Sequence, residues 1–181
     1  MKLYDHIEKH LGKIVEGWAP ETGKFNIQVV RFDATPLKGV STYSTLGLSN
    51  FVLNINEKKV RQEFVFSVYD HYSASEVASF LMTFAEYIAD TGNGLLRGSI
   101  KMGGALIDDA VSNGVYASVP VFFADEFNVF DSTVPPVVFV WLIPISDKDA
   151  DFIEANGWNE FEDRLEQNDC DFWSLNRNSI F

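Results

Sequence analysis

Hydrophobic positions in the first part of the chain predict one helix followed by several strands. Apolar residues recur at helical spacing from Leu3 to about Trp18, where Gly17 and Pro20 end the pattern. Shorter apolar runs with strand-like alternation come next, at residues 25–33, 42–47, 51–55 and 62–69. This part of the chain therefore has the pattern of a hairpin-rich sheet that follows a helix.

A longer helix and two apolar strands are predicted in the middle of the chain. From about Ser73 to Asp90, apolar residues form one stripe at helical spacing, and Ser73 with Glu76 has the pattern of a capping box. The segments 115–123 and 137–143 are rich in Val and Phe, which favours strands. We expect these two strands at the centre of the sheet.

Two helices are predicted after the last strand. Ser146 and Asp149 have the spacing of a second capping box, and the helix that they begin ends at Gly157. A further helix carries Phe161 and Leu165. The order of elements lacks the regular alternation of strand and helix that builds a parallel sheet. The sequence predicts a single α+β domain over residues 1–181, with a mixed, mostly antiparallel sheet.

The chain is strongly acidic, which excludes two classes of partner. Its 14 Lys and Arg against 26 Asp and Glu give a formal net charge of −12. Such a surface repels nucleic acid and anionic lipid, so we expect a basic protein as the partner, with no direct nucleic-acid binding and no membrane binding. The single cysteine allows no internal disulfide, and no apolar run is long enough for a membrane helix. We therefore expect a cytoplasmic protein.

Two motifs that bind metal or phosphate in other proteins are incomplete here. His6 and His10 have the spacing of zinc ligands on one helix face, but Glu8 points away from that face. A solvated helix face is the simpler interpretation. The glycines of 92–98 have one residue too many for a dinucleotide fingerprint, and they follow a helix instead of a strand. We expect no metal and no cofactor.

Nucleophile motifs are also incomplete. The segment Gly47-Leu48-Ser49 begins like a nucleophile elbow, but Phe51 stands where a second glycine is required. Cys170 lies between Asp169 and Asp171, whose charges disfavour a thiolate. We predict that the protein is not an enzyme.

Four segments agree in order and spacing with one family of binding domains. The segment 41–49 is similar to that family's Thr-x-Gly-hydrophobic-Ser strand end, and Arg61–Phe66 to its Glu-containing strand. The stretch 95–103 resembles its turn after the helix, and 140–146 its hydrophobic-Pro-Ile-Ser signature. Over about residues 25–180, the chain thus resembles the Suppressor-of-fused (SUFU-like) family.

This resemblance implies a non-enzymatic binding module. Animal members sequester a transcription factor, whereas bacterial members stand alone at about this size and are frequently immunity proteins that neutralise a toxin, often a nuclease. The short chain is more similar to the bacterial type. The function implied is that of an immunity protein or antitoxin whose partner is a cognate toxin, expected to be a basic nuclease. The alternative is a regulatory adaptor that binds an extended peptide at an exposed sheet edge.

An acidic C-terminal segment is one candidate surface for a basic partner. Residues 147–171 hold ten acidic and two basic side chains. Acids at such density steer a basic partner and match its charge. The alternative is a pair of solvated helix faces, with Asp147 and Asp149 serving a helix N-terminus.

A predicted loop between the two apolar strands is the other candidate surface. Its acids Asp125, Glu126 and Asp131 flank Phe127 and Phe130, and aromatic anchors among polar residues are typical of binding hot spots. The alternative is that the two rings fold back onto the core. The predicted partner-binding residues are Asp125, Glu126, Phe127, Phe130, Asp131, Asp147, Asp149, Asp151 and Asp171.

Overall fold

A single twisted sheet organises the computed structural model, which describes residues 2–22 and 24–181. Seven strands follow one another in the order β1-β2-β3-β5-β9-β7-β6, while β4 pairs with β5 and β8 pairs with β9. The contact between β5 and β9 is parallel, and the other pairs are antiparallel. The strands are β1 (Glu16–Trp18), β2 (Gln28–Phe32), β3 (Val40–Leu46), β4 (Leu53–Ile55), β5 (Lys58–Tyr69), β6 (Ile100–Met102), β7 (Gly114–Ser118), β8 (Val129–Phe130) and β9 (Val137–Ile145).

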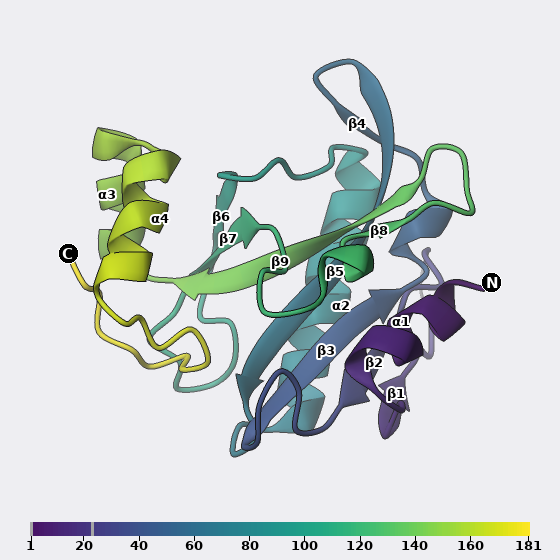
Figure 1. The fold of residues 1–181 in the computed structure, drawn as a ribbon, viewed down its shortest axis with the longest axis horizontal. Helices are drawn as coiled ribbons and strands as arrows, with labels where there is room; N and C mark the ends of the chain where they lie inside the picture. Colours follow the sequence, from purple (N-terminus) through teal and green to yellow (C-terminus); the bar gives the residue numbers. More distant parts are fainter. Residues whose placement is uncertain (1, 23) are drawn as a thin grey trace.

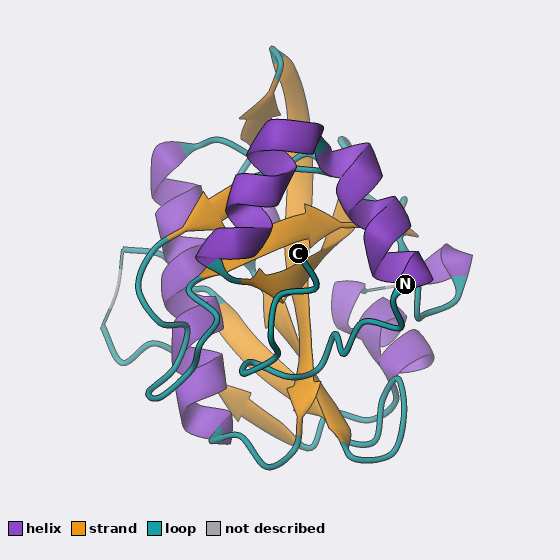
Figure 2. Ribbon diagram, turned by 90° about the vertical axis from the view of Figure 1, so that its left-hand side faces the viewer, coloured by secondary structure: helices purple, strands orange, loops and turns teal. Residues whose placement is uncertain are grey.

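Helices cover both faces of this sheet (Figures 1 and 2). The long helix α2 (Ala74–Thr91) packs against one face, where alternate residues Val140 and Leu142 of β9 join its cluster. On the opposite face, Trp141 and Ile143 pack with α3 (Asp147–Asn156) and α4 (Trp158–Gln167). Helix α1 (Leu3–Leu11) covers the other end of that face. The mixed, mostly antiparallel α+β architecture predicted from the sequence is confirmed.

Two predicted elements are shorter in the structure. The first helix ends at Leu11, because Gly12 adopts a positive φ of 95°, and residues 16–18 form the edge strand β1 instead. Strand β7 ends at Ser118, before Pro120, which has no N–H for the ladder. The sequence places both apolar strands at the centre of the sheet, but β7 lies next to the edge strand β6, and β9 lies beside β5, the middle strand of the seven.

Only one of the two predicted capping boxes forms. Ser146 Oγ accepts from Asp149 N, and Asp149 Oδ2 accepts from Ser146 N at 3.0 Å. Ser73 occupies the N-cap of α2, but its side chain makes no cap hydrogen bond and instead lies 3.2 Å from Ser75 Oγ. The α2 stripe nevertheless packs as expected, with Val77, Leu81 and Ile88 buried.

A buried carboxyl group joins two of the four segments that carry the family resemblance, 41–49 and 61–66. Glu63 of β5 has no exposed surface and accepts hydrogen bonds from Thr45 Oγ1, Gly47 N, Ser49 N and Ser49 Oγ at 2.5–3.1 Å. Burial raises the pKa of Glu63, and these donors oppose that shift by favouring the ionised form. Segment 45–49, which extends into the short helix η1 (Leu48–Asn50), is thus a structural clasp around Glu63.

Across the described residues, every helix falls short of the length and apolarity that a bilayer crossing requires.

Candidate partner-binding surfaces

The acidic loop predicted between the apolar strands is only partly exposed. Asp125 and Glu126, on the short helix η2 (Asp125–Phe127), and Asp131, which follows β8, point to solvent. Phe127 is completely buried, and Phe130 is 4 % exposed. The interpretation of these two rings as exposed anchors is wrong, because both belong to the core between α1 and the sheet.

Packing explains the burial of Phe127. Its ring lies 4.4 Å from that of Phe139 on β9 and 6.0 Å from that of His6 on α1. His6 is itself buried, and its Nε2 lies 3.1 Å from the Phe127 carbonyl oxygen. The face of α1 that carries His6 is therefore not solvated, contrary to the sequence interpretation. The His6 ring instead helps to fix η2 against α1.

Asp149 is also unavailable to a partner. Its side chain is 1 % exposed and accepts from Arg177 Nη2 at 2.9 Å and from Ser179 Oγ at 2.8 Å. Arg177 also donates to the Pro144 carbonyl oxygen. The predicted role of Asp149 at a helix N-terminus is confirmed, whereas contact with a partner would require the C-terminal segment to leave its site.

The remaining acids of α3 and α4 leave a large negative surface. Glu160 and Glu162 pair with arginines, and hydrogen bonds from Arg97, Tyr116 and Ser118 overcome the effect of burial to hold the pKa of Glu162 below its usual value. The other acids of this region are exposed and form no ion pair within residues 2–22 and 24–181: Asp147, Asp151, Glu154, Asp163, Glu166, Asp169 and Asp171.

An exposed aromatic residue that sequence reasoning missed lies between the two acidic regions. Phe122 is 42 % exposed and Val121 is 64 % exposed, in the loop that replaces the predicted end of β7. The Phe122 ring packs edge-on against Trp141, with centroids 5.2 Å apart, and lies 4.8 Å from Trp173. In the sequence, Pro120 indicates that Val121 and Phe122 lie in a loop, because a strand commonly ends before a proline.

An aromatic contact connects the loop that continues into Asp125 and Glu126 with the C-terminal segment that carries Asp171. Phe122 contacts Phe172 with ring centroids 5.5 Å apart, and Asp171 immediately precedes Phe172. Asp125 and Glu126 follow three and four residues after Phe122. We call the surface formed by Val121, Phe122, Asp125, Glu126, Asp169 and Asp171 the aromatic–acidic surface. It lies on the sheet face opposite α2.

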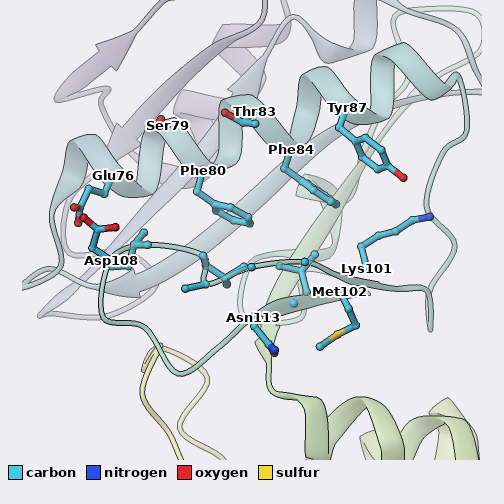
Figure 3. Close-up of a pocket in the computed structure, with 17 residues that line it drawn as sticks. Glu76, Ser79, Phe80, Thr83, Phe84, Tyr87, Lys101, Met102, Asp108 and Asn113 are labelled. Carbon is cyan, nitrogen blue, oxygen red and sulfur yellow. The ribbon is translucent and has the colours of Figure 1, made fainter.

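A groove lies beside α2, away from that surface. It has a volume of about 720 Å³ and runs between α2 and the segment 101–108. Phe80, Phe84 and Tyr87 line its helical side (Figure 3). Glu76 and Asp108 lie together at one end, and Lys101 lies near the other, as Figure 3 shows.

The edge strand β6 borders this groove. Gly103 N donates to Asn113 O, and Ala117 N donates to Ser99 O, so residues 99, 101 and 103 are the ones that bond to β7. Ile100 and Met102 therefore direct their N–H and C=O groups away from β7. Strand β6 thus ends the sheet on this side, with backbone groups that do not bond to β7.

We searched the part of the chain that the structure describes for metal ligands and reactive thiols. Within residues 2–22 and 24–181, no cluster of three His, Cys, Asp or Glu side chains has the geometry to hold a metal ion. Burial raises the pKa of the Cys170 thiol, and Asp149, Asp171 and Asp169 add to this effect. A reactive thiolate is thus disfavoured at this position.

Comparison with known proteins places these features in a family. The family model "Suppressor of fused protein (SUFU)" matches residues 23–178. The chain is 26 % identical over 173 residues to a protein named immunity protein YqcF from Bacillus subtilis, covering 93 % of this chain and 88 % of that protein.

Solved structures share the fold. A SUFU homologue from Neisseria gonorrhoeae superposes with a TM-score of 0.79 at 19 % identity, covering 98 % of this chain and 94 % of the homologue. A Sufu–Fu complex gives a TM-score of 0.71 at 13 % identity, with 98 % and 88 % of the two chains covered. Drosophila Suppressor of Fused gives 0.63 at 14 % identity, and the match covers 86 % of this chain and 42 % of that longer one. The chain belongs to the Suppressor of fused family.

Proposed function

We propose that this protein is a non-catalytic immunity protein, which binds and neutralises a cognate toxin through the aromatic–acidic surface. The observation that carries the proposal is the contact of the exposed Phe122 ring with Phe172, which connects the loop before Asp125 and Glu126 with the segment that carries Asp171. The name of the Bacillus subtilis relative supports the same class of function.

The expected partner is a basic protein, and a nuclease fits best. Nucleases grip phosphate backbones with basic residues, so an acidic inhibitor gains both faster encounter and charge complementarity at that site. Phe122 supplies what charge alone does not, because aromatic residues that become desolvated at an interface slow dissociation. The net charge of −12 and the unpaired acids of α3 and α4 extend the attraction beyond the contact itself.

Neutralising two acids of this surface tests the electrostatic part. The toxin to use is the one encoded beside this protein. The double variant Asp125→Asn/Glu126→Gln should associate more slowly, with an unchanged melting temperature, because both side chains are exposed. The matched control is Glu21→Gln/Glu57→Gln, which removes the same charge from exposed positions elsewhere. Equal association rates for the two double variants would move the interface away from η2.

Phe122→Ala tests the anchor. We expect faster dissociation, equivalent to a loss of about 2 kcal/mol or more in binding free energy. Val134→Ala is the control, since Val134 is 95 % exposed but lies outside the aromatic–acidic surface. Unchanged dissociation of the Phe122 variant would contradict the proposal.

A second candidate function, a peptide-binding adaptor, is favoured by the free edge of β6. Between Glu76 and Tyr87, α2 extends about 16 Å, which matches an extended peptide of about five residues. Phe80 and Phe84 would contact its apolar side chains, and Glu76 with Asp108 would pair with a basic one. A structural neighbour that forms a Sufu–Fu complex supports binding of a partner protein by this fold.

Met102→Pro, compared with Phe122→Ala, distinguishes the two functions. Met102→Pro removes the outward N–H of β6 while leaving its ladder bonds to β7 in place. Loss of partner binding in this variant, with binding retained in Phe122→Ala, would favour the adaptor. The opposite result would favour the aromatic–acidic surface. An adaptor should also bind several unrelated partners, whereas an immunity protein binds one.

A further inference from the structure

A basic recess interrupts the otherwise acidic surface. It has a volume of about 570 Å³ and lies where the N-terminus of α1 meets η1, the start of β5 and segment 130–137. Both Lys2 and Arg61 line it, with hydrogen-bonding side chains from Ser49, Asn50, Ser132 and Thr133. None of the ten described residues in its lining is an acid, in a chain that has 26 Asp and Glu.

Arg61 differs from the other four arginines in its partners. Arg31, Arg97, Arg164 and Arg177 each form an ion pair with a carboxylate. Among the described residues, Arg61 is in no such pair. Its Nη1 donates to the Ser49 carbonyl oxygen at 2.5 Å, and its Nε is buried without a hydrogen-bond partner. No carboxylate among the described residues therefore compensates the guanidinium charge, and its Nε–H group remains without an acceptor.

The clasp around Glu63 holds Arg61 in position. Glu63 Oε1 accepts from Ser49 N at 3.1 Å and from Ser49 Oγ at 2.7 Å, which fixes the carbonyl group that Arg61 contacts. Arg61 also lies in the β5 ladder opposite Val137 of β9. A guanidinium held in this way loses little freedom when it binds a ligand, so more of the interaction energy appears as affinity.

We propose that this recess binds an oxyanion, a carboxylate or phosphate group, with Arg61 as the main ligand and Lys2 as a second cation. The planar guanidinium matches both groups, since it can donate two parallel hydrogen bonds to their oxygens. The net charge of the protein does not prevent this, because exposed charges are screened over about 8 Å at 0.15 M ionic strength. The site is separate from the proposed toxin surface and does not depend on it.

Titration with inorganic phosphate and, separately, with acetate at constant ionic strength tests the site. Calorimetry and backbone amide shifts of residues 49–50 and 132–133 should show saturable binding of at least one probe. Saturation by phosphate alone would indicate a phosphorylated ligand, whereas saturation by acetate would indicate a carboxylate of a partner. Absence of saturable binding of either probe would overturn the proposal.

Variants connect the binding to named residues. Arg61→Gln should weaken binding about tenfold or more, as expected for a lost charge-assisted hydrogen bond. Arg61→Lys keeps the positive charge but loses the planar pair of N–H donors, and Lys2→Gln changes only an exposed side chain. Both variants therefore test the site even if Arg61→Gln folds poorly. Lys58→Gln, exposed on the same strand, is the control. Equal affinity in the wild type, Lys2→Gln and Arg61→Lys would contradict the proposed site.

Discussion

Gly98 lies against the indole ring of Trp158, so closely that a Cβ atom at position 98 would come within 2.7 Å of Trp158 Cγ. Its φ of +90° is also one that side chains rarely adopt. The guanidinium of Arg97, the preceding residue, lies 5.1 Å from the centroid of the Trp158 ring and pairs with Glu162. This contact fastens the acidic helix α4 to the loop before β6.

Gly98→Ala should therefore destabilise the protein by about 2 kcal/mol, combining backbone strain with overpacking. Urea denaturation measures the effect. The control is Gly104→Ala, where no atom lies within 4 Å of the added Cβ. Equal denaturation midpoints for the two variants would show that Trp158 can move aside without a loss of stability.

Removing the partner of Arg177 should destabilise the protein more. Asp149→Asn leaves the Arg177 guanidinium buried without a counter-charge, which costs roughly 3–5 kcal/mol in comparable buried pairs. Asp147→Asn, two residues away but exposed, should change stability little. Thermal unfolding of both variants provides the comparison, and similar losses in the two would contradict the role assigned to Asp149.

Phe127→Ala should act on folding and not directly on binding. The ring is completely buried against Phe139 and His6, so its removal should cost roughly 3–5 kcal/mol. Denaturation midpoints measure this loss, and Phe122→Ala, at a partly exposed ring, should lose less. A Phe127 variant as stable as the wild type would show that the Phe127 ring is not needed to hold η2 against the core.

Acidification should weaken folding through His10. Burial lowers the pKa of His10, and the nearby His6 and Lys9 lower it further, while Glu126 opposes the shift. The folded state thus favours neutral His10, and its Nε2 is buried without a partner. As pH falls below about 6.5, His10 takes up a proton more readily in the unfolded chain than in the folded protein. The contribution of neutral His10 to stability is therefore fully present above this pH and is lost progressively below it.

The measurement is the urea midpoint between pH 7.5 and 5.5, compared with His10→Gln. The variant should show a flatter dependence, because it cannot bind the proton. A dependence as steep as that of the wild type would assign the effect to other groups.

Local patterns predicted the elements well, and the surfaces less well. The helical stripe of α2, the Ser146–Asp149 box and the Val- and Phe-rich run of β9 depend on neighbours in sequence, and the structure confirms them. The burial of Phe127 depends on α1, which is more than a hundred residues away, so no local pattern could reveal it. The ion pair of Asp149 with Arg177 also joins residues that are not neighbours in sequence, so no local pattern indicates it. Phe122 was missed because Pro120 was included within a strand.

The parallel contact between β5 and β9 also has a consequence for how the chain reaches its native state. The two strands at this junction are separated by 67 residues between Tyr69 and Val137, with α2, β6 and β7 between them. Contacts over such sequence distances form slowly, because the intervening chain must first lose entropy in closing the loop. During synthesis, β5 is complete well before β9, so the edge of β5 that pairs with β9 stays unpaired in the meantime. The growing chain is most prone to aggregation in this interval, and substitutions that delay β9 should lower the yield of protein more than they lower its final stability.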